Sequence, residues 1–172
     1  MKQTGLIILL CMVVSVLFGI VHNQISARVS IEYFTVGHSR IIDSVSPVLL
    51  GIAWGVKSTW WVGLCLGILL SLAARTGNWP VRSAASLVKP MLTLVLFCAA
   101  SSASFGIAGY LLSARGMISV CRYMIPSISP DRHAAFVSAL WMHTASYTAA
   151  AMGGLILSVR TFAGRLSAGK QG

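Results

Sequence analysis

Residues 46–75, SPVLLGIAWGVKSTWWVGLCLGILLSLAAR, form an almost wholly apolar stretch that decides the fold class. As an α-helix with a rise of ~1.5 Å per residue, the stretch would be about 45 Å long. The hydrocarbon core of a bilayer is ~30 Å thick, so such a helix would cross it with one end protruding. Ser46 and Pro47 are typical of a helix start, with serine as N-cap and proline in the first turn. We therefore predict a membrane-spanning helix over residues 47–75.

Lys57, the charged residue in the middle of this stretch, is predicted to lie at a membrane boundary. About 27 Å of helix would separate it from Arg75, which is close to the thickness of the hydrocarbon core. A lysine at that depth can extend its amine into the headgroups, and the nearby Trp60 and Trp61 are typical of the aromatic belt at a membrane interface. Lys57 is thus either an interfacial anchor or part of a binding site.

The composition of the whole chain also indicates a membrane protein. Only 9% of the residues are charged, compared with about 25% in soluble domains. The net charge of +10 comes from basic residues scattered between apolar runs, so we expect anionic lipid headgroups as partners and no nucleic acid. The four cysteines form no CxxC pair, and neither a metal site nor a cofactor is expected. With 172 residues there is room for a single domain, residues 1–172.

Three further apolar runs predict additional spans, over about residues 5–21, 87–112 and 134–159. The first run lacks a convincing cleavage site, so we interpret it as an uncleaved span rather than a signal peptide. Serines 101, 102 and 104 of the third span are expected to bond to carbonyls of their own helix. Glycines four residues apart in the second span predict close helix packing. The expected fold class is therefore an all-α membrane protein, a bundle of four transmembrane helices.

Residues 22–46 and 113–133 are predicted to form outer loops. In the first loop, residues 24–33 alternate between polar and apolar side chains, which is the period of a β-strand. A turn around Gly37 would return the chain, giving a short extended segment or β-hairpin between helices 1 and 2. On the polar face of this strand, Glu32 could pair with Arg28.

The distribution of basic residues predicts the orientation. Four spans place both termini on one side, and the termini with the middle loop contain seven basic residues. The two outer loops contain five, together with all three acidic residues. By the positive-inside rule we expect a bacterial inner-membrane protein with both termini in the cytoplasm.

Polar side chains from several spans are predicted to meet near the outer boundary. His22 follows the first span, and His143 lies about 25 Å from the inner boundary of the fourth, so both would lie near the level of Lys57 and beneath Glu32. Ionisable residues within a membrane indicate function. The candidate ligand-binding residues are His22, Gln24, Glu32, Lys57, Trp60, Trp61, His143 and Tyr147.

This polar cluster is expected to bind a lipid headgroup or a small anion in a non-enzymatic membrane protein. No hydrolase or ATPase motif is present, and no catalytic residue is assigned. Two alternatives stay open: a transporter or channel subunit, and a membrane enzyme with histidine–glutamate acid–base chemistry. His22 could instead be an interface residue and His143 a hydrogen-bonded core residue. The glycine spacings permit a homo-oligomer or a membrane-protein partner.

Three segments resemble a bacterial family of small four-span membrane proteins of uncharacterised function. HNQI at residues 22–25, followed by VSIEYFT at 29–35, is similar to a pattern HDQ followed by SPEYFT. KSTWWVG at residues 57–63 matches KxTWWVG, and MHTASY at 142–147 is similar to MHNxSY. The departures are Asn23, Ile31 and Thr144, where the patterns have Asp, Pro and Asn. The resemblance implies the four-span architecture and marks the same candidate residues, with no activity attached to them.

Overall fold

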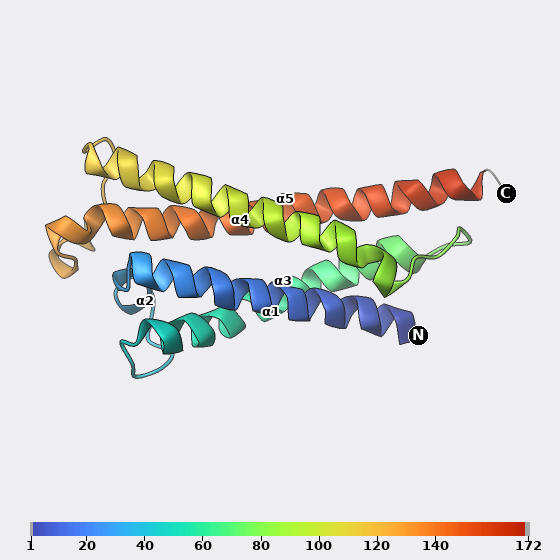
Figure 1. Ribbon diagram of the computed structural model, residues 1–172, viewed down its shortest axis with the longest axis horizontal. Helices are drawn as coiled ribbons and strands as arrows, with labels where there is room; N and C mark the ends of the chain where they lie inside the picture. The colour runs from blue at the N-terminus through green and yellow to red at the C-terminus, as the bar shows by residue number, and fades with distance from the viewer. Residues whose placement is uncertain (1, 171–172) are drawn as a thin grey trace.

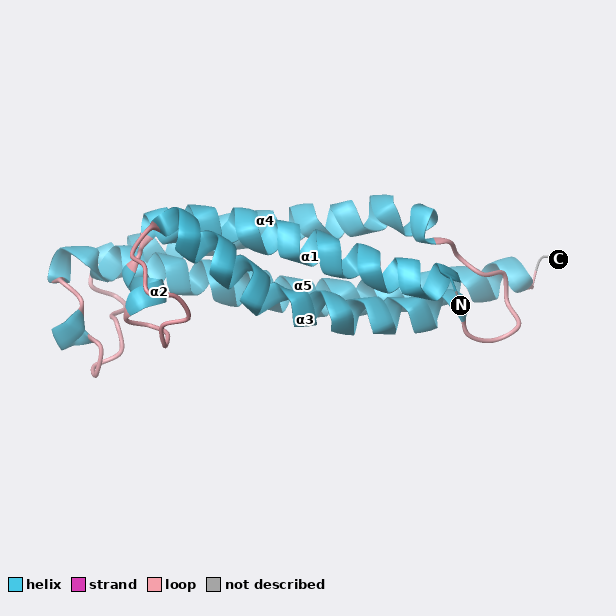
Figure 2. Cartoon of the chain, turned by 90° about the horizontal axis from the view of Figure 1, so that it is seen from below, coloured by secondary structure: helices cyan, strands magenta, loops and turns pink. Residues whose placement is uncertain are grey.

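The computed structural model describes residues 2–170, in which four long helices lie side by side (Figures 1 and 2). Successive long helices run in opposite directions, so both ends of the chain lie at the same end of the molecule (Figure 1). The outermost residues of the predicted domain 1–172 lie outside the described residues. The long helices are α1 (Lys2–Val29), α3 (Pro47–Arg75), α4 (Ala84–Ala114) and α5 (His133–Gly169), and the short elements are α2 (Glu32–Thr35) and the 3₁₀ turns η1 (Ile125–Ser127) and η2 (Pro130–Arg132).

Three helices in the described part of the chain, α1, α3 and α4, are long and apolar enough to cross a membrane. Large apolar side chains are exposed along them; Leu17 and Val21 of α1, for example, are 58% and 61% exposed. Such surfaces are unfavourable in water and are accommodated by lipid chains. The predicted all-α fold is confirmed, and its apolar helices indicate a membrane protein.

The helix boundaries agree with the predicted spans at some ends and exceed them at others. Helix α3 begins at Pro47 and ends at Arg75, as predicted, although the Ser46 side chain makes no capping hydrogen bond. Helix α4 begins at Ala84, three residues earlier than predicted, and Pro90 lies in its second turn. Helix α5 continues ten residues beyond the predicted end at residue 159, to Gly169.

The predicted β-strand over residues 24–33 is wrong. Helix α1 continues to Val29, α2 begins at Glu32, and residues 2–170 contain no strand. The buried positions 22, 23, 26, 27 and 30 recur at helical spacing, so this segment packs one helical face against its neighbours. A helix satisfies its backbone hydrogen bonds internally, whereas an isolated hairpin near the membrane leaves open edges. Tertiary packing therefore overrides the period-two pattern.

The long helices form two close pairs, α1 with α3 and α4 with α5, and α5 also contacts α3. Two clusters of buried apolar side chains hold these pairs together. One lies at the end of the molecule that carries the α1–α3 and α4–α5 connections, and it consists of Ala27, Tyr33, Phe34, Leu50, Val120, Ile128, Phe136, Val137 and Ala139. The other lies toward the termini and consists of Ile7, Cys11, Leu70, Ala74, Leu87 and Met91.

The extension of α5 is anchored by a buried arginine. Arg165 is 0% exposed, and its guanidinium donates to backbone carbonyls at the end of α3 and in the connection to α4. The last carbonyls of a helix have no intrahelical partner, and the helix dipole favours a cation there. Arg165 thus fixes the C-terminal part of α5 against the α3–α4 connection.

Candidate functional site

Two buried histidines, one from α1 and one from α5, contact each other inside the structure. The ring centroids of His22 and His143 are 4.6 Å apart in an edge-to-face arrangement, and the residues are 8% and 7% exposed. Phe18 stacks on His22 at 5.7 Å, and Tyr33 stacks on His143 at 4.3 Å. The structure therefore brings together two of the predicted site residues that are 121 positions apart in the chain.

Both ring nitrogens of His143 have hydrogen-bond partners. Nδ1 lies 2.8 Å from the Ala139 carbonyl oxygen, and Nε2 lies 2.8 Å from Oδ1 of Asn23. A neutral imidazole has a single N–H donor, so it satisfies both contacts when the Asn23 amide turns its NH₂ toward Nε2. A protonated ring satisfies both with the amide oxygen in place. The two arrangements differ by one proton and a rotation of the Asn23 side chain.

His22, in contrast, has a free hydrogen-bonding position. Its Nδ1 lies 3.4 Å from Oγ of Ser102 on α4, but its buried Nε2 has no partner within residues 2–170. When the Ser102 hydroxyl donates to Nδ1, the ring proton is on Nε2, which is then a donor without an acceptor. Leaving such a group unpaired in an apolar interior costs about 1–3 kcal/mol, so it favours a ligand or a water molecule.

A cavity of about 50 Å³ lies beside the two histidines, between α1, α3 and α5. It is large enough for more than one water molecule. Hydroxyl, amide and imidazole groups supply its polar lining, and none of the lining residues is an acid, a lysine or an arginine. The lining residues are Ser15, Phe18, Gly19, His22, Asn23, Ser58, Thr59, Val62, His143, Ser146, Tyr147 and Ala150. The lining therefore carries no fixed negative charge, and its hydroxyls on Ser58, Thr59, Ser146 and Tyr147 already donate to backbone carbonyl oxygens.

Two further predicted residues lie near this cavity in different ways. Tyr147 lines it and donates its hydroxyl hydrogen to the Ser58 carbonyl oxygen at 3.2 Å. Gln24 lies between α1 and α3, where its Nε2 donates to the Val48 carbonyl at 2.9 Å and its Oε1 accepts from Arg28. Tyr147 thus belongs to the site, whereas Gln24 connects two helices outside it.

Lys57, Trp60 and Trp61 do not join the histidines. Lys57 is exposed, and its Nζ lies 5.0 Å from the ring centroid of Trp54. Trp60 and Trp61 are 45% and 49% exposed. The predicted meeting of Lys57 with the two histidines is therefore not found, because its position on α3 turns the side chain away from the cavity. Its geometry fits the alternative interpretation, an anchor at the membrane boundary.

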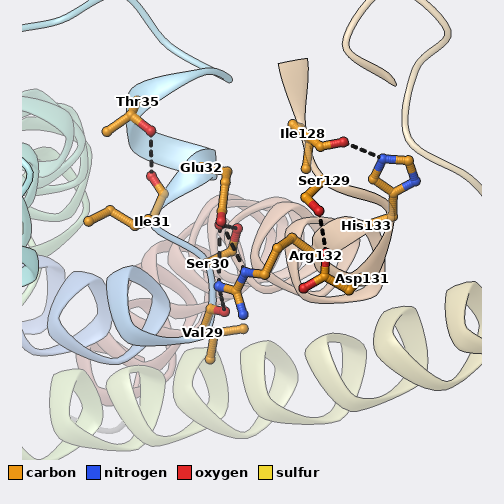
Figure 3. Close-up of polar contacts among 10 residues, drawn as sticks. All are labelled: Val29, Ser30, Ile31, Glu32, Thr35, Ile128, Ser129, Asp131, Arg132 and His133. Atoms are coloured by element: carbon orange, nitrogen blue, oxygen red, sulfur yellow. Dashed lines mark hydrogen bonds and ion pairs between the residues drawn. The ribbon is translucent and has the colours of Figure 1, made fainter. Parts of the chain in front are cut away.

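Glu32 is also separate from the cavity; with Arg132 it forms an ion pair, here called the latch, that joins the α1–α3 connection to the α4–α5 connection (Figure 3). Arg132 Nε donates to Glu32 Oε1 at 3.0 Å, and Ser30 Oγ donates to Oε2 at 2.7 Å. Arg132 also donates to the Val29 carbonyl, where α1 ends. The suggested pairing of Glu32 with Arg28 is wrong, since it depended on the strand geometry that the chain does not adopt.

The latch changes the acidity of its carboxyl group. Partial burial alone would raise the pKa of Glu32, but the hydrogen bonds from Arg132 and Ser30 and the arginine charge together lower it. The same hydrogen bond has the opposite effect on its donor and raises the pKa of Arg132. The ionised pair is thus the stable form at neutral pH.

This shift predicts a pH-dependent contribution to stability. Because the folded pKa of Glu32 is below its ordinary value of 4.5, the stabilisation is complete above pH ~5 and is lost as the pH falls through the folded value. We expect Glu32→Gln to lower the free energy of unfolding by about 1 kcal/mol at pH 6, or about 3 °C in the thermal midpoint. The difference from wild type should narrow as the pH falls below the ordinary pKa of 4.5 and through the folded value.

The matched control for this measurement is Asp43→Asn. Asp43 also pairs with an arginine, Arg40, but the two side chains are 97% and 69% exposed. We expect no pH-dependent difference for this variant, since exposed pairs contribute little. A Glu32→Gln difference that stays constant between pH 6 and pH 3 would contradict the role of the ionised latch.

Three residues of these polar networks were missed by sequence reasoning. Asn23 was noted only as a departure from a motif; the signal that could have found it is the helical spacing of the polar positions 22, 23, 26 and 30, which places them on one helical face. Ser102 was expected to bond within its own helix, but its contact reaches His22. Arg132 meets Glu32 across 100 residues of chain, and no local pattern indicates such a partner.

Within residues 2–170, no group of three or more histidine, cysteine or acidic side chains is placed to hold a metal ion. Comparisons with protein-family models, curated proteins and solved structures yield no match for this chain. The resemblance to a four-span bacterial family therefore stays a prediction.

Proposed function

We propose that all four long helices cross a membrane. Helices α1, α3 and α4 have the required length and apolarity, and α5 lies alongside them over their length (Figures 1 and 2). Helix α5 is polar mainly where it faces the other helices, since Ser138, His143 and Ser146 are buried. A helix with that distribution can present its remaining apolar surface to lipid.

The proposed location is a bacterial inner membrane, with both termini in the cytoplasm. Both termini lie at one end of the molecule, opposite the loops that contain the three acids (Figure 1). More basic residues lie in the termini and the α3–α4 region than in the two opposite loops, which supports this orientation. The first set is Lys2, Arg75, Arg82, Lys89, Arg160, Arg165 and Lys170, and the second is Arg28, Arg40, Arg115, Arg122 and Arg132.

The cavity beside His22 and His143 is proposed to bind a small anion or an anionic oxygen of a lipid headgroup. The observation that carries this proposal is the buried Nε2 of His22, which has no partner within residues 2–170 and belongs to a residue that lines the cavity. Neutral donors in a low-dielectric site bind anionic oxygen through charge-assisted hydrogen bonds. The protein is then a non-enzymatic binding component of the membrane.

Two arms of one experiment identify the source of the anion. Native mass spectrometry of the gently solubilised protein detects a lipid that is retained from the membrane. NMR of protein labelled with ¹⁵N-histidine, titrated with inorganic phosphate or chloride, detects a small anion as a shift of the His22 Nε2 resonance. We expect His22→Leu to lower the affinity for the bound ligand about tenfold or more, because one hydrogen bond to a charged group is lost.

Lys57→Ala is the matched control, because Lys57 lies outside the cavity on the neighbouring helix α3. We expect this variant to retain the ligand as wild type does. Equal retention by His22→Leu and wild type would contradict the proposal. If Lys57→Ala loses the ligand and His22→Leu retains it, the ligand binds at Lys57 and not in the cavity.

A further inference from the structure

A second pocket lies between α4 and α5 at the end of the molecule that carries both termini. Its volume is about 320 Å³, and it shares no residue with the cavity of the two histidines. Basic and hydroxyl side chains line it together with apolar ones. The lining residues are Arg82, Ser86, Leu87, Pro90, Leu157, Arg160 and Thr161.

Two arginines approach this pocket from different elements. Arg82 lies just before α4, and its guanidinium reaches α5, because a Cβ added at Gly164 would lie 3.8 Å from Arg82 Nη2. Gly164 is one helical turn after Arg160, so the two positions share a face of α5. The Arg82 guanidinium therefore lies on the face of α5 that also carries Arg160.

These two positive charges lack an internal partner. Within residues 2–170, neither the Arg82 nor the Arg160 side chain donates a hydrogen bond, and the two salt bridges are both in the opposite loops. The acids Glu32, Asp43 and Asp131 all lie at that opposite end. Among the residues that the structure describes, the pocket thus combines two unpaired guanidinium groups with no neutralising acidic side chain, which favours an external anion.

Two backbone donors at the start of α4 are already paired. The Ser86 N–H donates to Ser83 Oγ, and the Ala84 N–H donates to Gln3 Oε1. The Ser86 and Thr161 hydroxyls also donate to carbonyls of their own segments, so the arginines are the side-chain donors of the lining that are left for a ligand. Below them, Leu87, Pro90 and Leu157 form an apolar wall, which distinguishes this pocket from a site for a freely dissolved anion.

We propose that this pocket binds an anionic phospholipid, with the phosphate between Arg82 and Arg160 and an acyl chain along the apolar wall. Guanidinium groups bind phosphate oxygens in a planar, bidentate geometry, and basic residues at a membrane surface attract anionic lipids. The site uses other residues than the His22 cavity and lies at the opposite end of the molecule. It is therefore independent of the function proposed above.

The test is native mass spectrometry of the full chain in detergent, mixed with phosphatidylglycerol or with phosphatidylcholine. Wild type should retain phosphatidylglycerol in preference to phosphatidylcholine. The double variant Arg82→Gln/Arg160→Gln should retain phosphatidylglycerol about thirtyfold less, since each basic residue contributes about one kcal/mol of attraction. Both side chains are exposed, so the thermal midpoint should stay unchanged.

The control is Arg115→Gln/Arg122→Gln, which removes the same charge from exposed residues at the other end. It should retain phosphatidylglycerol as wild type does; an equal loss in both double variants would overturn the site in favour of general surface charge. Arg82→Lys/Arg160→Lys keeps the charge but lacks the planar fork of donors, so its retention should lie between that of wild type and that of the glutamine variant. Unchanged retention in the glutamine variant, or displacement of the lipid by excess inorganic phosphate, would also overturn the proposal.

Discussion

Arg165→Met should lower the free energy of unfolding by at least ~3 kcal/mol, one of the largest effects expected of a single substitution in this protein. Arg165 Nη1 donates to Ala73 O at 2.7 Å and Nη2 to Thr76 O at 2.8 Å. Nε donates to Pro80 O at 2.9 Å, and Nη2 also contacts Trp79 O at 3.3 Å. Methionine fills much of the space but leaves these buried carbonyls without donors.

The measurement is unfolding by SDS titration, followed by circular dichroism in detergent. Arg160→Met is the control, because it removes the same charge from an exposed position five residues earlier on α5. Arg165→Lys should lie between wild type and Arg165→Met, since an ammonium cannot reproduce the planar fork of donors. Equal midpoints for Arg165→Met and Arg160→Met would show that the buried arginine does not hold the end of α5.

The double substitution Gly55→Val/Gly63→Val should separate α1 from α3 and cost about 2–6 kcal/mol, because overpacking costs about 1–3 kcal/mol at each position. A Cβ at Gly55 would lie 2.6 Å from the Ile20 Cα, and one at Gly63 would lie 2.7 Å from the Met12 Cα. These contacts are with backbone, so no side-chain rotation relieves them. In lipid, helix association depends on such close packing.

The same SDS titration measures this effect, and Gly5→Ala is its matched control. Gly5 is also a helical glycine of α1, but a Cβ there would meet no atom within 4 Å. We expect Gly5→Ala to be neutral or stabilising by about 0.5–1 kcal/mol, since alanine favours the helix. Wild-type stability in the Gly55→Val/Gly63→Val variant would mean that the two helices are not held by this interface.

The close-packing interpretation of the glycines on α3 was derived from sequence and is confirmed by their burial. Gly51, Gly55, Gly63 and Gly67 are all buried, and an added Cβ at each would meet α1. The spacing of four residues was sufficient for this prediction because it places the two glycines of each pair, Gly51 with Gly55 and Gly63 with Gly67, on one helical face. Which helix would occupy that face was not predictable, since every apolar run in the chain was an equal candidate.

The candidate site was predictable only in part. His22 and His143 were recognised because ionisable side chains are rare within apolar runs. Their contact with each other depends on how α1 and α5 are rotated, and a change of one residue along a helix turns a side chain by about 100°. The same rotation decides that Lys57 is exposed and that Asn23 and Ser102 face the histidines.

The sequence by itself determined the all-α class and the bounds of α3, because long apolar runs with capping and breaking residues are local signals. The tertiary structure alone decided three further features: the helical continuation of α1 through residues 24–29, the Glu32–Arg132 latch and the anchoring of α5 by Arg165. Each depends on partners contributed by distant parts of the chain. Burial against those partners outweighs local periodicity, since an unpaired polar group in an apolar interior costs more than a favourable local pattern supplies.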